Sequence, residues 1–168
     1  IQFSQKVKPT GCLVTKYGLK RSGELEAAHH YTYSFDDAHA DVHAIGIKVE
    51  NGSYVFDVIN RNTKWVLQDV VLHMGGLHNI ENAIAAITVA KHLNIEDEKI
   101  KAAIESFKGV RRRFEYVLKS ADHVLIDDYA HHPEELRALI TGVRSIFSEQ
   151  KITVVFQPHL YSRTNDLA

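Results

Sequence analysis

Two clusters of polar side chains in this sequence could do chemistry, and each directly follows a short apolar run. The first cluster is 127–133, Asp-Asp-Tyr-Ala-His-His-Pro, and the second is 157–164, Gln-Pro-His-Leu-Tyr-Ser-Arg-Thr. Arg163 suits a carboxylate ligand, because its guanidinium fork makes two parallel charge-assisted hydrogen bonds. A surface ion pair is the alternative for Arg163. In the first cluster, the alternative for Asp127 and Asp128 is that one caps a helix or turn and the other is only solvated. The alternative for His132 is a place next to the helix N-cap.

A third candidate group lies at 78–82, where the residues His78 and Asn79 precede Asn82 at the start of a predicted helix. Asn79 and Asn82 are three residues apart and therefore share a helix face. Their amides both donate and accept hydrogen bonds, which suits recognition of a purine edge. A capping asparagine plus an exposed one is the alternative reading.

Several familiar motifs are missing from the chain. Gly18 and Gly23 have the spacing of a phosphate-binding loop, but Glu24 and Leu25 follow instead of the required Lys and Ser or Thr. His39 and His43 would bind a metal together only on a helix, and this segment is predicted to be a loop entering a strand. We therefore expect no metal site. The single Cys12 cannot form an intrachain disulfide, which fits a reducing compartment and a buried structural thiol.

The last third of the chain has the alternation of an α/β unit. Val124–Ile126 is predicted to be a strand, a helix begins at Pro133, and 152–156 is predicted to be the next strand. Strand, helix and strand of these lengths predict a right-handed βαβ unit with parallel strands. Both polar clusters would then lie beyond carboxyl ends of strands, at the edge where open sheets bind ligands.

The first part of the chain is richer in strands. The pattern predicts strands at 11–15, 42–49, 54–59 and 64–72, with Asn51-Gly52 as a hairpin turn, and helices at about 79–92 and 97–107. The change of pattern after Gly109 predicts a boundary that divides the chain into 1–108 and 109–168.

Composition indicates a globular protein: 45% of the 168 residues are hydrophobic and the net charge is −1. Arg111–Arg113 is the only basic run, so we expect no nucleic-acid partner. No stretch of about 18 apolar residues is present, so we expect no membrane span. The chain begins at Ile1 and resembles an internal fragment, which we expect to be cytoplasmic because no signal peptide is found.

Four segments between residues 75 and 164 resemble motifs of the Mur ligase family. These are 76–83, 107–114, the aspartate-histidine segment 127–133 and the segment 157–164, the last being similar to the alanine-adding member. The resemblance implies an α/β fold of two pieces. Residues 1–108 would be the end of a central ATPase domain with β-hairpins and a helix pair, and 109–168 the start of a Rossmann-like C-terminal domain.

The resemblance further implies an ATP-dependent ligase of peptidoglycan synthesis. ATP would activate the carboxylate of UDP-N-acetylmuramate as an acyl phosphate, which the amine of L-alanine then attacks. The phosphate loop and the Mg²⁺ ligands would lie outside this chain, which would hold no catalytic residue and be inactive alone. Two alternatives are a sister ligase that recycles a murein tripeptide, and a non-catalytic nucleotide-binding module.

The resemblance also implies two groups of binding residues. Leu160 stands where some family members have arginine, so Arg163 would carry more of the carboxylate binding. The ATP-binding group comprises His78, Asn79, Asn82, Arg113 and Asp128, with Asp128 at the ribose, and the L-alanine group comprises Tyr129, His159 and Arg163.

Overall fold

The computed structural model describes residues 2–158. Its first part is a mixed five-stranded sheet with the strand order β1-β2-β3-β4-β5. The first three strands run parallel to one another, and the last two are added antiparallel. Short 3-10 turns at Ser4–Lys6 and Ser22–Glu24 flank β1. The strands are β1 (Cys12–Lys16), β2 (His29–Ser34), β3 (Val42–Glu50), β4 (Ser53–Asn60) and β5 (Val66–Leu72).

The hairpin between β3 and β4 turns at the predicted residues. Asn51 and Gly52 both have positive φ, of 51° and 73°. A two-residue hairpin turn with two positive φ angles matches the twist of its strands, and Asn-Gly adopts it at low cost. Beyond the turn, alternate side chains of β4 such as Tyr54, Phe56 and Val58 are buried in the core.

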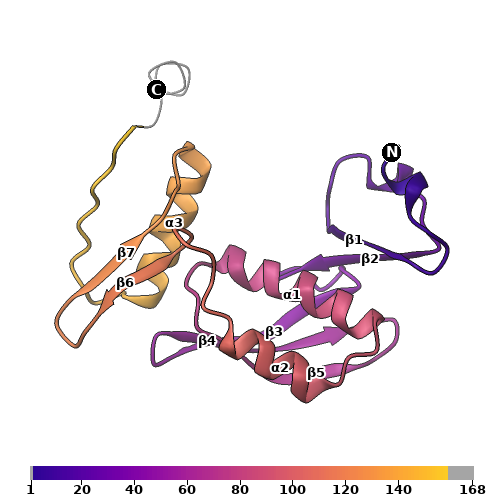
Figure 1. Cartoon of the computed structure of the whole chain (residues 1–168), viewed down its shortest axis with the longest axis horizontal. Coiled ribbons are helices and arrows are strands. Elements are labelled where there is room, and N and C mark those ends of the chain that lie inside the picture. The colour runs from indigo at the N-terminus through magenta and orange to yellow at the C-terminus, as the bar shows by residue number, and fades with distance from the viewer. Residues whose placement is uncertain (1, 159–168) are drawn as a thin grey trace.

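Two helices, α1 (Leu77–His92) and α2 (Asp97–Ser106), cover one face of this sheet (Figure 1). The apolar face of α1, including Ile80, Ile84 and Ile87, is buried against the sheet. These helices and the strands β1, β3, β4 and β5 confirm the predicted elements. β2 was not predicted, because its sequence His-His-Tyr-Thr-Tyr-Ser lacks an apolar alternation and only Ser34 is buried in it.

The second part of the chain lies at the opposite end of the molecule from the N-terminus (Figure 1). It consists of an antiparallel pair, β6 (Glu115–Lys119) and β7 (Val124–Asp127), followed by α3 (Pro133–Ile146). β7 and α3 confirm the predicted strand and helix, whereas β6 was not predicted.

The strand predicted at 152–156 differs from the structure. Residues 151–158 are extended but pair with no strand of the described chain, so the parallel βαβ unit is not completed within residues 2–158. Parallel strands are normally covered by helices on both faces, and α3 is the only helix that follows β7 in the described residues. A cavity of about 580 Å³ lies between β7, α3 and this extended segment.

No helix in the described part of the chain is long and apolar enough to cross a membrane.

Candidate functional site

The two parts of the chain meet where α3 and the residues before β6 pack on the loop between β5 and α1. Phe114 is only 2% exposed, and a Cβ atom added to Gly75 would overlap its ring. A Cβ atom added to Gly142 of α3 would lie 2.7 Å from the Cα atom of Gly76. Glycines at these positions therefore allow the backbone of α3 to approach the loop closely.

Buried hydroxyl groups lie at the same junction. The hydroxyl groups of Tyr54 and Ser145 are 3.1 Å apart, which joins β4 to α3. The Tyr116 hydroxyl is buried and has no hydrogen-bond partner within residues 2–158. Burial, with a smaller effect of the nearby Tyr54, raises the pKa of Tyr116 to about 12. The Tyr116 phenol is therefore neutral near pH 7 and is not an acid or base for catalysis there, whereas the Tyr54 hydroxyl links β4 to α3.

His78 lies in the first turn of α1, where it meets charges from the second part of the chain. Partial burial lowers the pKa of His78 below its ordinary value. The negative charge of Asp128 raises the pKa of His78, and the positive charge of Arg113 lowers it. His78, Arg113 and Asp128 are therefore close enough for their charges to influence one another.

The two asparagines of α1 have different environments. Asn79 is buried and donates its side-chain amide to the carbonyl oxygen of Gly75, at 2.7 Å. Asn82 is exposed, and its amide lies 3.4 Å from the Asn79 side-chain oxygen. Asn79 therefore orders the loop that contains Gly75 and Gly76, the glycine loop, and Asn82 is the amide that is open to a ligand. Between them, Glu81 pairs with Lys16 at the end of β1, at 2.9 Å.

Asp128 joins two stretches of backbone. One carboxylate oxygen accepts the backbone N–H of Phe114 and the other accepts that of Ala130, each at 2.7 Å. Each carboxylate oxygen can accept more than one hydrogen bond, so these contacts leave capacity for a ligand hydroxyl. Asp128 therefore also orders the junction. Its contact with Ala130, two residues on, is the turn-capping alternative for one of the two aspartates, whereas its contact with Phe114 was not predicted.

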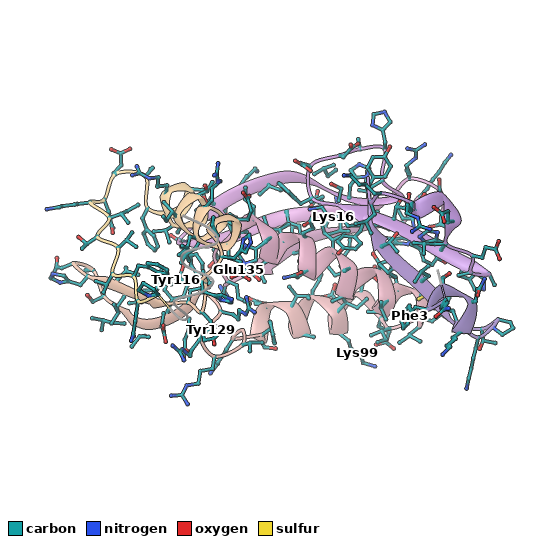
Figure 2. The ribbon with its side chains drawn as sticks, turned by 90° about the horizontal axis from the view of Figure 1, so that it is seen from above. Phe3, Lys16, Lys99, Tyr116, Tyr129 and Glu135 are labelled. Atoms are coloured by element: carbon teal, nitrogen blue, oxygen red, sulfur yellow. The ribbon has the colours of Figure 1, made fainter. Side chains whose placement is uncertain are left out.

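The histidines of the 127–133 segment form the start of α3. The side chain of His132 accepts the backbone N–H of Glu134, and Glu135 accepts the N–H groups of His131 and His132, a capping box. The hydrogen bond from the backbone N–H of His131 contributes most to lowering the pKa of Glu135. Figure 2 labels Glu135 and Tyr129 at this end of the molecule. The helix-capping alternative for His132 is thus what the structure shows.

Tyr129 is 38% exposed beyond the end of β7 and contacts Arg112. The Arg112 guanidinium lies 5.1 Å from the centre of the Tyr129 ring. The family resemblance assigned a role to Arg113 but none to Arg112, although both belong to the same motif. His159 and Arg163, the other predicted L-alanine residues, lie outside the described residues.

Within residues 2–158 no group of three or more His, Cys, Asp or Glu side chains could hold a metal ion. His39 and His43 do not share a helix, because His43 lies in β3 and His39 in the preceding loop. The His39 ring instead lies 2.8 Å from the Asp37 carboxylate. The described residues therefore contain no assembled metal centre.

A family model described as the Mur ligase, glutamate ligase domain matches residues 112–168. A protein of Parabacteroides distasonis named UDP-N-acetylmuramate–L-alanine ligase is 40% identical over 168 residues, which is 99% of this chain and 36% of that protein. One of the same name from Porphyromonas gingivalis is 44% identical over 166 residues, covering 98% and 36%. The chain thus spans about a third of the length of these curated relatives.

Solved structures support the same relationship. The crystal structure of the UDP-N-acetylmuramate–alanine ligase of Thermotoga maritima superposes with a TM-score of 0.74 at 27% identity, over 87% of this chain and 33% of that one. The folylpolyglutamate synthetase of Lactobacillus casei superposes with a TM-score of 0.73 at 17% identity, over 98% of this chain and 42% of that one, which shows the fold alone. With matching motifs, relatives and fold, this chain belongs to the Mur ligase family.

Proposed function

We propose that the protein containing this chain is an ATP-dependent ligase that joins L-alanine to UDP-N-acetylmuramate. One observation carries the proposal: the charges of Arg113 and Asp128, from the second part of the chain, act on His78 in the first turn of α1, and Asp128 accepts the N–H of Phe114, which packs on Gly75 just before that helix. The relatives named for this activity align with nearly the whole chain, including this junction. A nucleotide bound there would contact both parts of the chain at once.

The proposed nucleotide site uses groups of suitable chemistry. Asn82 offers an exposed amide to the adenine edge, while Asn79 holds the glycine loop beneath it. Neutral His78 can contact the base without carrying a second positive charge. Arg113 is exposed and supplies a permanent positive charge for the phosphates, and Asp128 retains acceptor capacity for the ribose hydroxyls.

In the proposed reaction, ATP phosphorylates the muramate carboxylate and the amine of L-alanine attacks the resulting acyl phosphate. A new C–N bond forms, the C–O bond to phosphate breaks, and the amine loses a proton. Tyr129, with His159 and Arg163, would hold the amino acid. Closure of the two parts would exclude water from the acyl phosphate.

Parts of the machinery are proposed to lie elsewhere. The phosphate loop and any Mg²⁺ ligands would come from residues outside this chain, because none of its segments provides a phosphate cradle. The 168-residue chain alone is therefore proposed to be inactive. The use of ATP and a UDP-sugar favours a cytoplasmic location.

The test is phosphate release by the full-length protein with ATP, UDP-N-acetylmuramate and L-alanine together, and with each omitted in turn. We expect release only when all three are present, with mass spectrometry showing a product heavier by one alanine residue. Turnover with a murein tripeptide in place of L-alanine would indicate the recycling ligase instead. ATP binding without any turnover would indicate a non-catalytic nucleotide-binding module.

A further inference from the structure

Arg112 holds the segment that carries Tyr129 through both its backbone and its side chain. The backbone N–H of Tyr129 donates to the carbonyl oxygen of Arg112, at 2.8 Å. The guanidinium of Arg112 lies over the Tyr129 ring, 5.1 Å from its centre. The Nε atom of the same guanidinium lies 3.6 Å from a carboxylate oxygen of Asp127. Arg112 therefore contacts both Tyr129 and the end of β7, the strand that precedes Tyr129.

The position of Arg112 is itself fixed by its neighbours. Its φ angle is 60°, in the left-handed region that few residues other than glycine adopt. Its backbone N–H donates to the Glu115 carboxylate, at 2.8 Å, at the start of β6. Two residues later, Phe114 is anchored in the junction against Gly75. These contacts on both sides hold an otherwise uncommon backbone conformation.

A second ring contacts Tyr129. The His131 ring meets it edge to face, with the ring centres 5.4 Å apart, and the His131 Nδ1 atom lies 3.0 Å from the Tyr129 carbonyl oxygen. His131 in turn lies 3.5 Å from the Glu135 carboxylate of α3. Tyr129 nevertheless remains 38% exposed, so its ring is ordered by protein contacts while part of it stays accessible to a small ligand.

We propose that Arg112 is a positioning residue that holds Tyr129 in the orientation required to bind the amino-acid substrate. The inference rests on the proposed function and concerns a residue that the sequence motifs did not distinguish from its neighbours. Arg113, the next residue, acts electrostatically on His78 and Glu135. Consecutive arginines thus serve different substrates: Arg113 the nucleotide, and Arg112, through Tyr129, the amino acid.

The test is the KM for L-alanine of the full-length protein, measured by phosphate release at saturating ATP and UDP-sugar. Arg112→Ala should raise this KM about 2- to 5-fold, the effect of one exposed cation–π contact. The kcat and the KM for ATP should stay at their wild-type values, which a general loss of structure would not leave unchanged. Arg111→Ala removes an exposed guanidinium one residue earlier and is the matched control. Its KM for L-alanine should equal that of the wild type.

A double-variant cycle with Tyr129→Ala shows whether Arg112 acts through that ring. If it does, Arg112→Ala added to Tyr129→Ala raises the KM for L-alanine no further. A further 2- to 5-fold increase in the KM for L-alanine of the double variant overturns this inference but not the proposed function. Equal increases in the KM values for ATP and L-alanine in Arg112→Ala do the same. An unchanged KM for L-alanine in Arg112→Ala overturns it as well. Absence of L-alanine-dependent turnover in the wild type overturns the proposed function together with this inference.

Discussion

The contact between α3 and the glycine loop makes Gly142→Ala an informative substitution. In an exposed helix, replacing glycine with alanine stabilises the helix by roughly 0.8–1 kcal/mol. Here the new Cβ atom would lie 2.7 Å from the Cα atom and 3.2 Å from the backbone nitrogen of Gly76. Because both neighbours are backbone atoms, they cannot move aside by rotation of a side chain. The helix and the loop must separate instead.

The size of the effect follows from these two opposing contributions. Overpacking of this kind costs about 1–3 kcal/mol, which exceeds the gain in helix propensity. We expect a net local destabilisation of about 1 kcal/mol, or roughly a fivefold change in an opening equilibrium. Thr141 is exposed on the same helix and provides the control. Thr141→Ala should only gain helix propensity and should therefore stabilise α3.

Native-state hydrogen exchange of the full-length protein measures this local equilibrium directly. Amides of α3 and of the loop at Gly76 should exchange about five times faster in Gly142→Ala than in the wild type. The same amides of α3 should exchange more slowly in Thr141→Ala. Slower exchange in both variants would refute the close packing of α3 on the loop, because Gly142 would then behave as an ordinary helix position.

Three further predictions concern binding and pH. Arg163→Ala should raise the KM for L-alanine about 10- to 150-fold, because loss of a hydrogen bond to a charged group costs about 1.5–3 kcal/mol, and should leave the KM for ATP unchanged. Asn82→Ala should raise the KM for ATP alone. Equal effects of Arg163→Ala on both KM values would contradict the assignment. The lowered pKa of His78 means that the unfolded chain binds a proton at this position at a higher pH than the folded chain does. Thermal melting should therefore show His78→Gln gaining stability over the wild type as pH falls below 6.5, and a stability difference that stays constant across this range would contradict the prediction. Glu135→Gln should lose roughly 0.3–1 kcal/mol at pH 7 in urea unfolding. This deficit should begin to shrink as pH falls below 4.5, where the unfolded carboxyl takes up its proton, and should vanish once the pH is below the lowered pKa of the folded carboxyl; a deficit that does not shrink below pH 4.5 would contradict a charge effect.

Much of the fold could be predicted because local chemistry determined it. The Asn51-Gly52 turn, the apolar spacing of α1 and Pro133 at the start of α3 each act within a few residues. β2 could not be predicted, because its pairing with β1 and β3 places mostly polar and aromatic side chains in a sheet. For the segment 152–156 the error is the opposite one: its apolar residues predict a strand, but the structure shows none there. A strand also requires a neighbouring strand to pair with and layers that cover it, and these are not encoded in the segment itself.

For the proposed site, the sequence predicted candidate residues but not the contacts that these residues make within the protein. The motifs indicated His78, Arg113 and Asp128, and the structure brings them to one junction. They did not indicate that Asp128 accepts two backbone N–H groups, nor that Asn79 donates to Gly75. Such contacts depend on how distant backbone segments meet, and a residue type alone does not specify them.

The unpaired edge of β7 has a consequence for contacts with other chains. Among the described residues only β6 pairs with β7, and Val155 in the following extended segment is 94% exposed. An open strand edge next to apolar side chains is a template for pairing with other chains. Since residues 151–158 leave this edge unpaired, we expect it to be the place where the 168-residue chain associates with strands of other molecules.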